Sequence, residues 1–200
     1  MFRDDEVEFH DGLWITTRVR TWLDCARKMS VDELVVVADH LVRVPREAFE
    51  GRSEPYATMP ELAAMLDRHK GTPGIVKARE ALRLARVGSD SPQETKVRLA
   101  CGRAGLPEPE LNVPTTLSPG VSRTPDQSYP EYKVASEYDG DTHNDPRQVV
   151  RDVERADDYR RAGWIEVRIM KTHMLNDAKE AVRKIRDALH SRGWRSASDH

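Results

Sequence analysis

The chain has 200 residues, of which 38% are hydrophobic and 33% are charged, a balance typical of a soluble globular protein with one moderately large domain or two small ones. No run approaches the roughly 20 apolar residues that a membrane span needs, and the acidic start is unlike a secretory signal. We therefore expect a cytoplasmic protein that does not contact membranes. The net charge of -2 excludes the strongly basic balance of proteins that wrap along phosphates, although a local basic strip is compatible with it.

Residues 1–88 are expected to form a small all-α region. From Thr21 to about Val87, apolar residues recur at the spacing of amphipathic helices. Pro60 and Pro73 stand at the start of two of these runs, where proline is favoured in a first helical turn. No acid or histidine in this region has a spacing typical of catalysis. The turn-forming cluster that begins at Gly88 marks the predicted boundary.

Residues 89–194 are expected to form an α/β domain, and residues 195–200 a disordered tail. Capping residues, turn residues and apolar periodicity predict the following elements in order: a helix from Ser91 to Gly105, extended segments at roughly 110–117, 122–129 and 132–139, a helix that starts with Asp145 and Pro146 and ends at Gly163, a strand over Trp164–Met170, and a last helix from about Asn176. This order predicts helices packed on a mixed sheet.

Three carboxylates are expected to converge on one face of that sheet. A two- or four-residue turn centred on Pro130-Glu131 would place Asp126 opposite Ala135. Glu137 and Asp139 would then share that face, because side chains alternate along a strand. A three-residue turn would reverse this parity. Carboxylates so close repel one another unless a cation joins them, and oxygen ligands suit Mg²⁺ or Mn²⁺.

Glu94 and His143 are further candidates, and each has a purely structural alternative. Glu94 lies on the inward side of its helix, where a fourth carboxylate would join the site, but a capping box with Ser91 explains the same residue without chemistry. His143 follows Asp139 in the turn before the next helix. There it would act as a base or acid, or it is an ordinary surface residue.

Four motifs of the C-terminal half resemble the very-short-patch-repair endonucleases, a group within the PD-(D/E)XK restriction-endonuclease-like superfamily: SPQE, RTPDQSYPEYKVASEYDGDTH, RDVER and AGWIEVRI. The resemblance covers about residues 89–190. It implies a restriction-endonuclease-like mixed sheet flanked by helices, and metal-dependent cleavage of DNA. The stretch LWITTRVRTWLDCARKMSVDELVVVADHLVR also resembles the helical N-terminal region of actinobacterial-type relatives.

The resemblance also implies roles for individual residues. Asp126 would be the first metal-binding carboxylate and Glu137 the second, with Asp139 beside them and Mg²⁺ (or Mn²⁺) as the cofactor. Asp139 stands where many superfamily members have lysine, so His143 or the more distant Lys171 would have to replace that lysine. Glu94 would orient the site or bind a second ion, and His143 would shuttle a proton.

Arginines crowd the helix that follows the site: Arg147, Arg151, Arg155, Arg160 and Arg161. Arg151 and Arg155 are the predicted DNA contacts, although a run of charge is also typical of a solvated helix face. Arg155 either contacts phosphate or pairs with Asp152 one turn earlier.

Two other functions stay open from the sequence. The first is a catalytically inactive nuclease-fold module that binds nucleic acid, because the usual lysine is missing. The second is a protein-interaction role in a defence or toxin–antitoxin-type system, in which the N-terminal helices bind a second copy of the chain or another protein.

Overall fold

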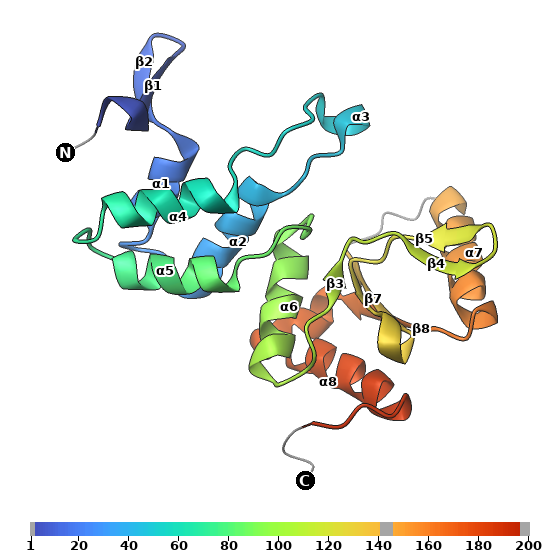
Figure 1. Cartoon of the computed structure of the whole chain (residues 1–200). Helices are drawn as coiled ribbons and strands as arrows, with labels where there is room; N and C mark the ends of the chain where they lie inside the picture. Colours follow the sequence, from blue (N-terminus) through green and yellow to red (C-terminus); the bar gives the residue numbers. More distant parts are fainter. Residues whose placement is uncertain (1–2, 141–145, 197–200) are drawn as a thin grey trace. The chain divides into compact units, whose positions relative to one another are not determined.

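The computed structural model describes residues 3–140 and 146–196, and of residues 146–150 it describes the backbone alone (Figure 1). The chain divides into two compact units, Met1–Pro92 and Gln93–His200. Among the helices so described, none combines the length and apolar character that a membrane crossing requires.

Five helices form most of the N-terminal unit: α1 (Arg18–Cys25), α2 (Val31–Val42), α3 (Glu47–Glu50), α4 (Met59–Arg68) and α5 (Ile75–Leu84). Capping boxes begin α2 and α4, where Ser30 and Thr58 accept from the backbone N–H groups of the glutamates three residues later. The apolar faces meet around Trp22, which is 1% exposed and whose indole N–H donates to the carbonyl of Leu34 at 3.0 Å.

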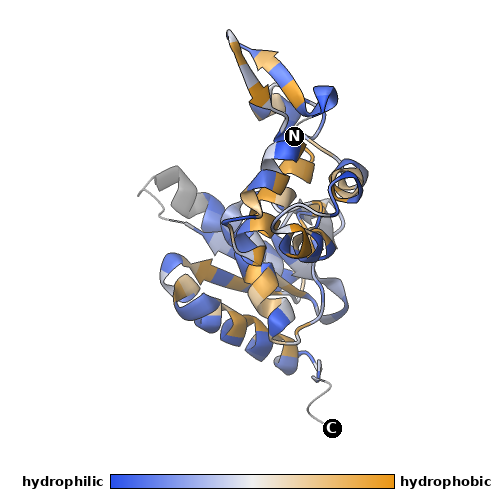
Figure 2. Ribbon diagram, turned by 90° about the vertical axis from the view of Figure 1, so that its left-hand side faces the viewer, coloured by the Kyte–Doolittle hydropathy of each residue, from blue (hydrophilic) through white to orange (hydrophobic). Residues whose placement is uncertain are grey.

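A β-hairpin precedes these helices, so the prediction of an all-α N-terminal region is wrong here. Strands β1 (Val7–His10) and β2 (Leu13–Thr16) pair antiparallel. The turn residues Asp11 and Gly12 both have positive φ, as the Asp-Gly dipeptide of a tight hairpin turn requires. Figure 2 shows apolar residues along both strands, and the facing rings of Phe9 and Trp14 lie 5.4 Å apart.

Glu6 joins the start of the chain to the helices. It lies in a short 3-10 helix, η1 (Asp4–Glu6), and is fully buried. Its carboxylate accepts from Arg20 and lies 2.6 Å from Nε2 of His69 and 3.5 Å from Nη2 of Arg68. Burial favours the neutral acid, but the hydrogen bonds from His69 and Arg20 outweigh it and lower the pKa of Glu6 to about 2.

The C-terminal unit is of the α/β class, as predicted. Its elements are α6 (Pro92–Arg103), β3 (Glu110–Leu111), β4 (Thr115–Ser118), β5 (Val121–Arg123), β6 (Gln127–Tyr129), η2 (Pro130–Tyr132), β7 (Val134–Asp139), α7 (Pro146–Arg161), β8 (Ile165–Met170), η3 (Lys171–Met174) and α8 (Leu175–Ser191). The main sheet has the order β3-β6-β7-β8, in which only the β7–β8 pair is parallel (Figure 1). The first two predicted extended segments are each split, because β4 and β5 pair with one another in a separate hairpin.

Alternation along β7 and β8 gives the main sheet two different faces. On one face, Val134, Val167 and Ile169 join an apolar core with residues of α6 and α8. The apolar stripe predicted for the last helix is confirmed: Ala178, Val182, Ile185 and Leu189 are all buried. The other face carries charged side chains toward α7.

The register between β6 and β7 differs from the predicted one by two residues. Ser128, rather than Asp126, lies opposite Ala135. The reason is the turn, in which η2 occupies three residues and Lys133 adds a fourth with a φ of 52°. The turn therefore has four residues, one of the two predicted lengths, but is centred one position later. A shift of two residues keeps every side chain on its predicted face.

Gly74, at the start of α5, provides a test of the helix packing. Its φ is +90°, and a Cβ there would lie 2.4 Å from the carbonyl oxygen of Ala26. We expect Gly74→Ala to lower the free energy of unfolding by about 3 kcal/mol or more, since strain and a backbone clash add together. The measurement is urea unfolding of the full chain.

Gly51 supplies the matched control in the same unit. Its φ is +65° and a Cβ there would meet nothing within 4 Å, so Gly51→Ala should cost only about 1 kcal/mol. Equal losses in the two variants would show that Gly74 does not pack as described.

Candidate active site

Asp126 and Glu137 lie across from each other at the end of the antiparallel β6–β7 pair. Gln127 pairs with Ser136, and continuing this register by one residue sets Asp126 opposite Glu137. The backbone N–H of Tyr138 donates to Oδ2 of Asp126 at 2.6 Å. A main-chain group of β7 therefore fixes the carboxylate of Asp126 beside Glu137.

Glu137 is a partly buried carboxylate that forms no ion pair within 4 Å among the described residues, although Arg155 lies near enough to act on its charge. Its one hydrogen bond among these residues is from the hydroxyl of Tyr159, and at 3.4 Å it is long. Burial raises the pKa of Glu137 to about 7, and the neighbouring carboxylates of Glu166 and Glu94 add to the rise against the opposing effect of Arg155. Its negative charge is therefore poorly compensated by the protein itself.

Glu94 is brought to the same end of the sheet. It is 7% exposed, and its Oε2 accepts from the side-chain amide of Asn112 at 2.8 Å. The backbone N–H of Asn112 in turn donates to the carbonyl of Asp126 at 3.2 Å. Asn112 therefore connects Glu94 to Asp126 through hydrogen bonds. This connection fits a role of Glu94 in orienting the site.

Asp139 shares the face of Glu137, but its charge is compensated. Its Oδ2 lies 3.0 Å from Nη2 of Arg168, and the same nitrogen lies 3.0 Å from Oδ2 of Asp152 on α7. Arg168 is the Cα partner of Glu137 in the parallel β7–β8 pair. No role is predicted for Arg168 from the sequence, although the alternation of β8 places it on the face opposite the apolar residues.

The two arginines predicted to bind DNA differ in their surroundings. Arg155 pairs with Asp152 at 3.1 Å and with Glu166 at 2.9 Å, so it forms ion pairs within the unit. Arg151 is exposed on α7. His143 lies outside the residues that the structure describes.

The oxygen donors of Asp126 and Glu137 suit Mg²⁺ or Mn²⁺. Within the described parts of the chain, no group of three or more histidine, cysteine, aspartate and glutamate side chains gathers closely enough to hold a metal ion. The only buried thiol at this unit's core, Cys101, does not change this, because burial raises its pKa to about 12. A metal at this site would be held by two facing carboxylates and would need a movement of Asp139 or Glu94 to gain a third.

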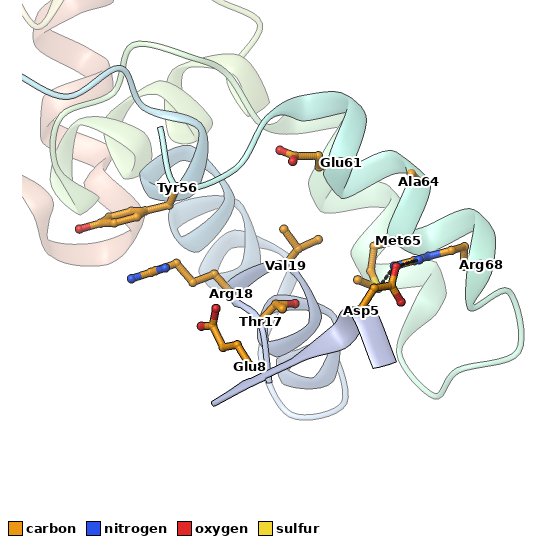
Figure 3. Close-up of a pocket in the computed structure, with 10 residues that line it drawn as sticks. All are labelled: Asp5, Glu8, Thr17, Arg18, Val19, Tyr56, Glu61, Ala64, Met65 and Arg68. Atoms are coloured by element: carbon orange, nitrogen blue, oxygen red, sulfur yellow. Dashed lines mark hydrogen bonds and ion pairs between the residues drawn. The ribbon is translucent and has the colours of Figure 1, made fainter. Parts of the chain in front are cut away.

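A separate cavity of about 440 Å³ lies within the N-terminal unit, between the start of α1 and α4 (Figure 3). Several of its charged side chains already have partners. Arg68 pairs with Asp5, Glu61 caps α4, and the guanidinium of Arg18 lies 4.4 Å from the centre of the Tyr56 ring.

Comparison with known proteins gives relatives but no activity. No family model matches the chain, and no solved structure matches it either. The curated relatives it matches include the uncharacterized proteins Rv2248 and MT2308 from two strains of Mycobacterium tuberculosis, each 32% identical over 111 residues. The match covers 55% of this chain and 41% of each relative, so it spans less than half of their length.

The raised pKa of Glu137 predicts a pH-dependent cost to stability. Between pH 4.5 and about 7 the native state keeps a proton that the unfolded state releases, so the free energy of unfolding falls as the pH rises through this window. Glu137→Gln should therefore raise the free energy of unfolding at pH 8 by about 1–3 kcal/mol, and this gain should shrink toward pH 4.5. Urea unfolding in EDTA at several pH values measures it.

Glu166→Gln is the control, because this neighbouring glutamate is paired with Arg155. Removing its charge should destabilise the protein at pH 8. A loss of stability in both variants would mean that the charge of Glu137 is well compensated after all.

Proposed function

We propose that this protein is a metal-dependent hydrolase that cleaves DNA phosphodiester bonds, with its active site at the end of β6 and β7. The observation that carries the proposal is geometric: among the described residues Glu137 forms no ion pair and accepts one long hydrogen bond, and the β6–β7 register, continued by one residue, sets it opposite Asp126. A carboxylate that lacks an ion pair and lies beside a second carboxylate is costly to keep charged, and a bound cation would relieve that cost.

Asp126 and Glu137 would hold the cation, Mg²⁺ or Mn²⁺, and Asp139 and Glu94 are the candidates for a third ligand. When bound, such an ion lowers the pKa of a water molecule and neutralises charge that develops on the phosphate. The motifs shared with the very-short-patch-repair endonucleases support the same assignment, and the PD-(D/E)XK superfamily is the proposed family.

The surrounding residues orient the two carboxylates. The Tyr138 N–H donates to Asp126, the Tyr159 hydroxyl donates to Glu137, and the Asn112 side chain donates to Glu94. Arg151 is exposed on α7 and is the proposed contact to the DNA backbone. His143 stays the proposed proton shuttle, and a cytoplasmic location remains part of the proposal.

One observation favours a second function, a catalytically inactive module that binds nucleic acid. Asp139 is paired with Arg168, and the described residues supply no complete group of three metal ligands. In that case the protein would bind DNA in the presence of EDTA and would not cleave it.

Cleavage assays distinguish these functions. Purified protein is incubated with plasmid and with single-stranded DNA, in Mg²⁺, in Mn²⁺ or in EDTA. We expect cleavage only with a divalent ion, and a loss of about 100-fold or more in Asp126→Asn and in Glu137→Gln, because each substitution removes a charged ligand.

The matched control is Glu180→Gln. Glu180 is a partly exposed glutamate of α8 that pairs with Arg183, far along the chain from the site. This variant should cleave like the wild type. Cleavage that neither active-site substitution reduces would reject the assigned site, and DNA binding without any cleavage would favour the inactive module.

A further inference from the structure

The β1–β2 hairpin leaves large apolar side chains exposed. Phe9 is 63% exposed and Trp14 is 72% exposed, although their rings pack on one another, and Leu13 and Ile15 are exposed as well. In the described parts of the chain neither strand pairs with a third one, and Figure 1 shows the hairpin projecting from the helices of its unit. A two-stranded hairpin is only marginally stable by itself in water, so a partner that covers it would stabilise it.

The free edge of β2 lacks the features that usually prevent an edge strand from pairing with another chain. Charged side chains and prolines normally do this. The four residues of β2, Leu13–Thr16, are all uncharged, whereas β1 contains Glu8 and His10. His10 and Leu13 close the two-residue turn. Since hydrogen-bonded and non-hydrogen-bonded pairs alternate in an antiparallel ladder, the backbone N–H and C=O of Trp14 then point to the free edge.

Charge limits the kind of partner that fits this hairpin. Residues 4–16 include five aspartates and glutamates and no lysine or arginine. Nucleic acid and anionic lipid surfaces would therefore be repelled. The uncharged edge of β2 in a second copy of the chain meets no such repulsion.

Two copies of β2 can pair antiparallel about a two-fold axis, as an isologous interface requires. Pairing Trp14 with Trp14 of the second copy joins their outward backbone groups and sets Leu13 opposite Ile15. In this register the turn of one copy reaches the start of α1 in the other. Asp11 of the turn then lies near Arg18, an exposed arginine that stacks on a tyrosine ring and has no carboxylate partner among the described residues. The two ends of the paired strands are therefore complementary in charge.

The exposed area predicts a weak dimer. Aromatic side chains bury about 150–250 Å² each, so at these exposures Phe9 and Trp14 together offer roughly 250–300 Å² per copy. Leu13 and Ile15 add to this area. Stable complexes bury about 800 Å² per partner, and weak ones less than about 600 Å². We therefore expect a dissociation constant on the order of 10–100 µM, as in transient complexes.

We propose that the β2 edge of this hairpin is a docking surface for a second copy of the chain, so that two hairpins join into one four-stranded sheet. Phe9 and Trp14 of both copies would lie on the same face of that sheet. This inference goes beyond the proposed function, since it concerns the N-terminal unit and assumes neither a metal nor DNA.

Sedimentation equilibrium of the full chain tests the proposal. The average mass should rise from one chain toward two between about 1 and about 200 µM. Trp14→Lys should raise the dissociation constant by about tenfold or more, because it places a charge on the pairing edge. Two controls should dimerise like the wild type. Glu8→Lys adds the same lysine to β1, and Phe49→Lys removes an aromatic residue of α3 that is 86% exposed.

Amide hydrogen exchange in the wild type keeps the test independent of misfolded variants. The Trp14 N–H should exchange about threefold or more slowly at about 200 µM than at about 5 µM, because pairing protects it only in the dimer. The Phe9 N–H is the internal control. It points to the opposite edge, on β1, and should exchange equally fast at both concentrations.

Each outcome supports or rejects the docking surface. A chain that stays monomeric at about 200 µM rejects the second copy as the occupant and leaves another protein in its place. Dimerisation that persists in Trp14→Lys, or that is also lost in either control variant, rejects the β2 edge. Loss confined to Trp14→Lys, together with protection of the Trp14 amide at high concentration, supports the proposal.

Discussion

The two-residue period of β7 is the constraint from which the rest of the C-terminal unit follows. Val134 must enter the apolar core with α6 and α8, and this forces Glu137 and Asp139 onto the opposite face. That face is covered by α7, where a charge without a partner is costly. This cost is offset by ion pairs that connect Asp139, Arg168, Asp152, Arg155 and Glu166. Glu137 forms none of these ion pairs.

This arrangement explains why Glu137 both destabilises the native state and is a candidate functional residue. A carboxylate that is buried beside other carboxylates destabilises the native state whenever it is charged. Replacing it would stabilise the fold, and a cation would achieve the same without a change of sequence. Glu137 therefore has a strongly raised pKa, a property that is common among the residues of functional sites. Asp139, by contrast, forms an ion pair with Arg168.

Much of the α/β unit could be predicted because local signals agree there. Pro146 and Gly163 bound α7, and the alternation over Trp164–Met170 describes β8. The β6–β7 register was misjudged by two residues, because the centre of the turn depends on a 3-10 helix and on the positive φ of Lys133. The role of Arg168 could not be predicted, because its partners depend on the parallel β7–β8 register, which no local pattern encodes. The hairpin β1–β2 also has a local signal, the Asp11-Gly12 turn, which the prediction of an all-α region does not include.

The parallel pairing of β7 with β8 also has a kinetic consequence. Val134 pairs with Ile165, so this ladder closes only after α7 has been traversed, and such non-local contacts form slowly compared with helices and hairpins. Before β8 docks, Asp139 and Asp152 have no guanidinium from Arg168 between them. A nascent chain that emerges in order from the ribosome would therefore complete the β6–β7 pair before it acquires the arginine that lies between Asp139 and Asp152.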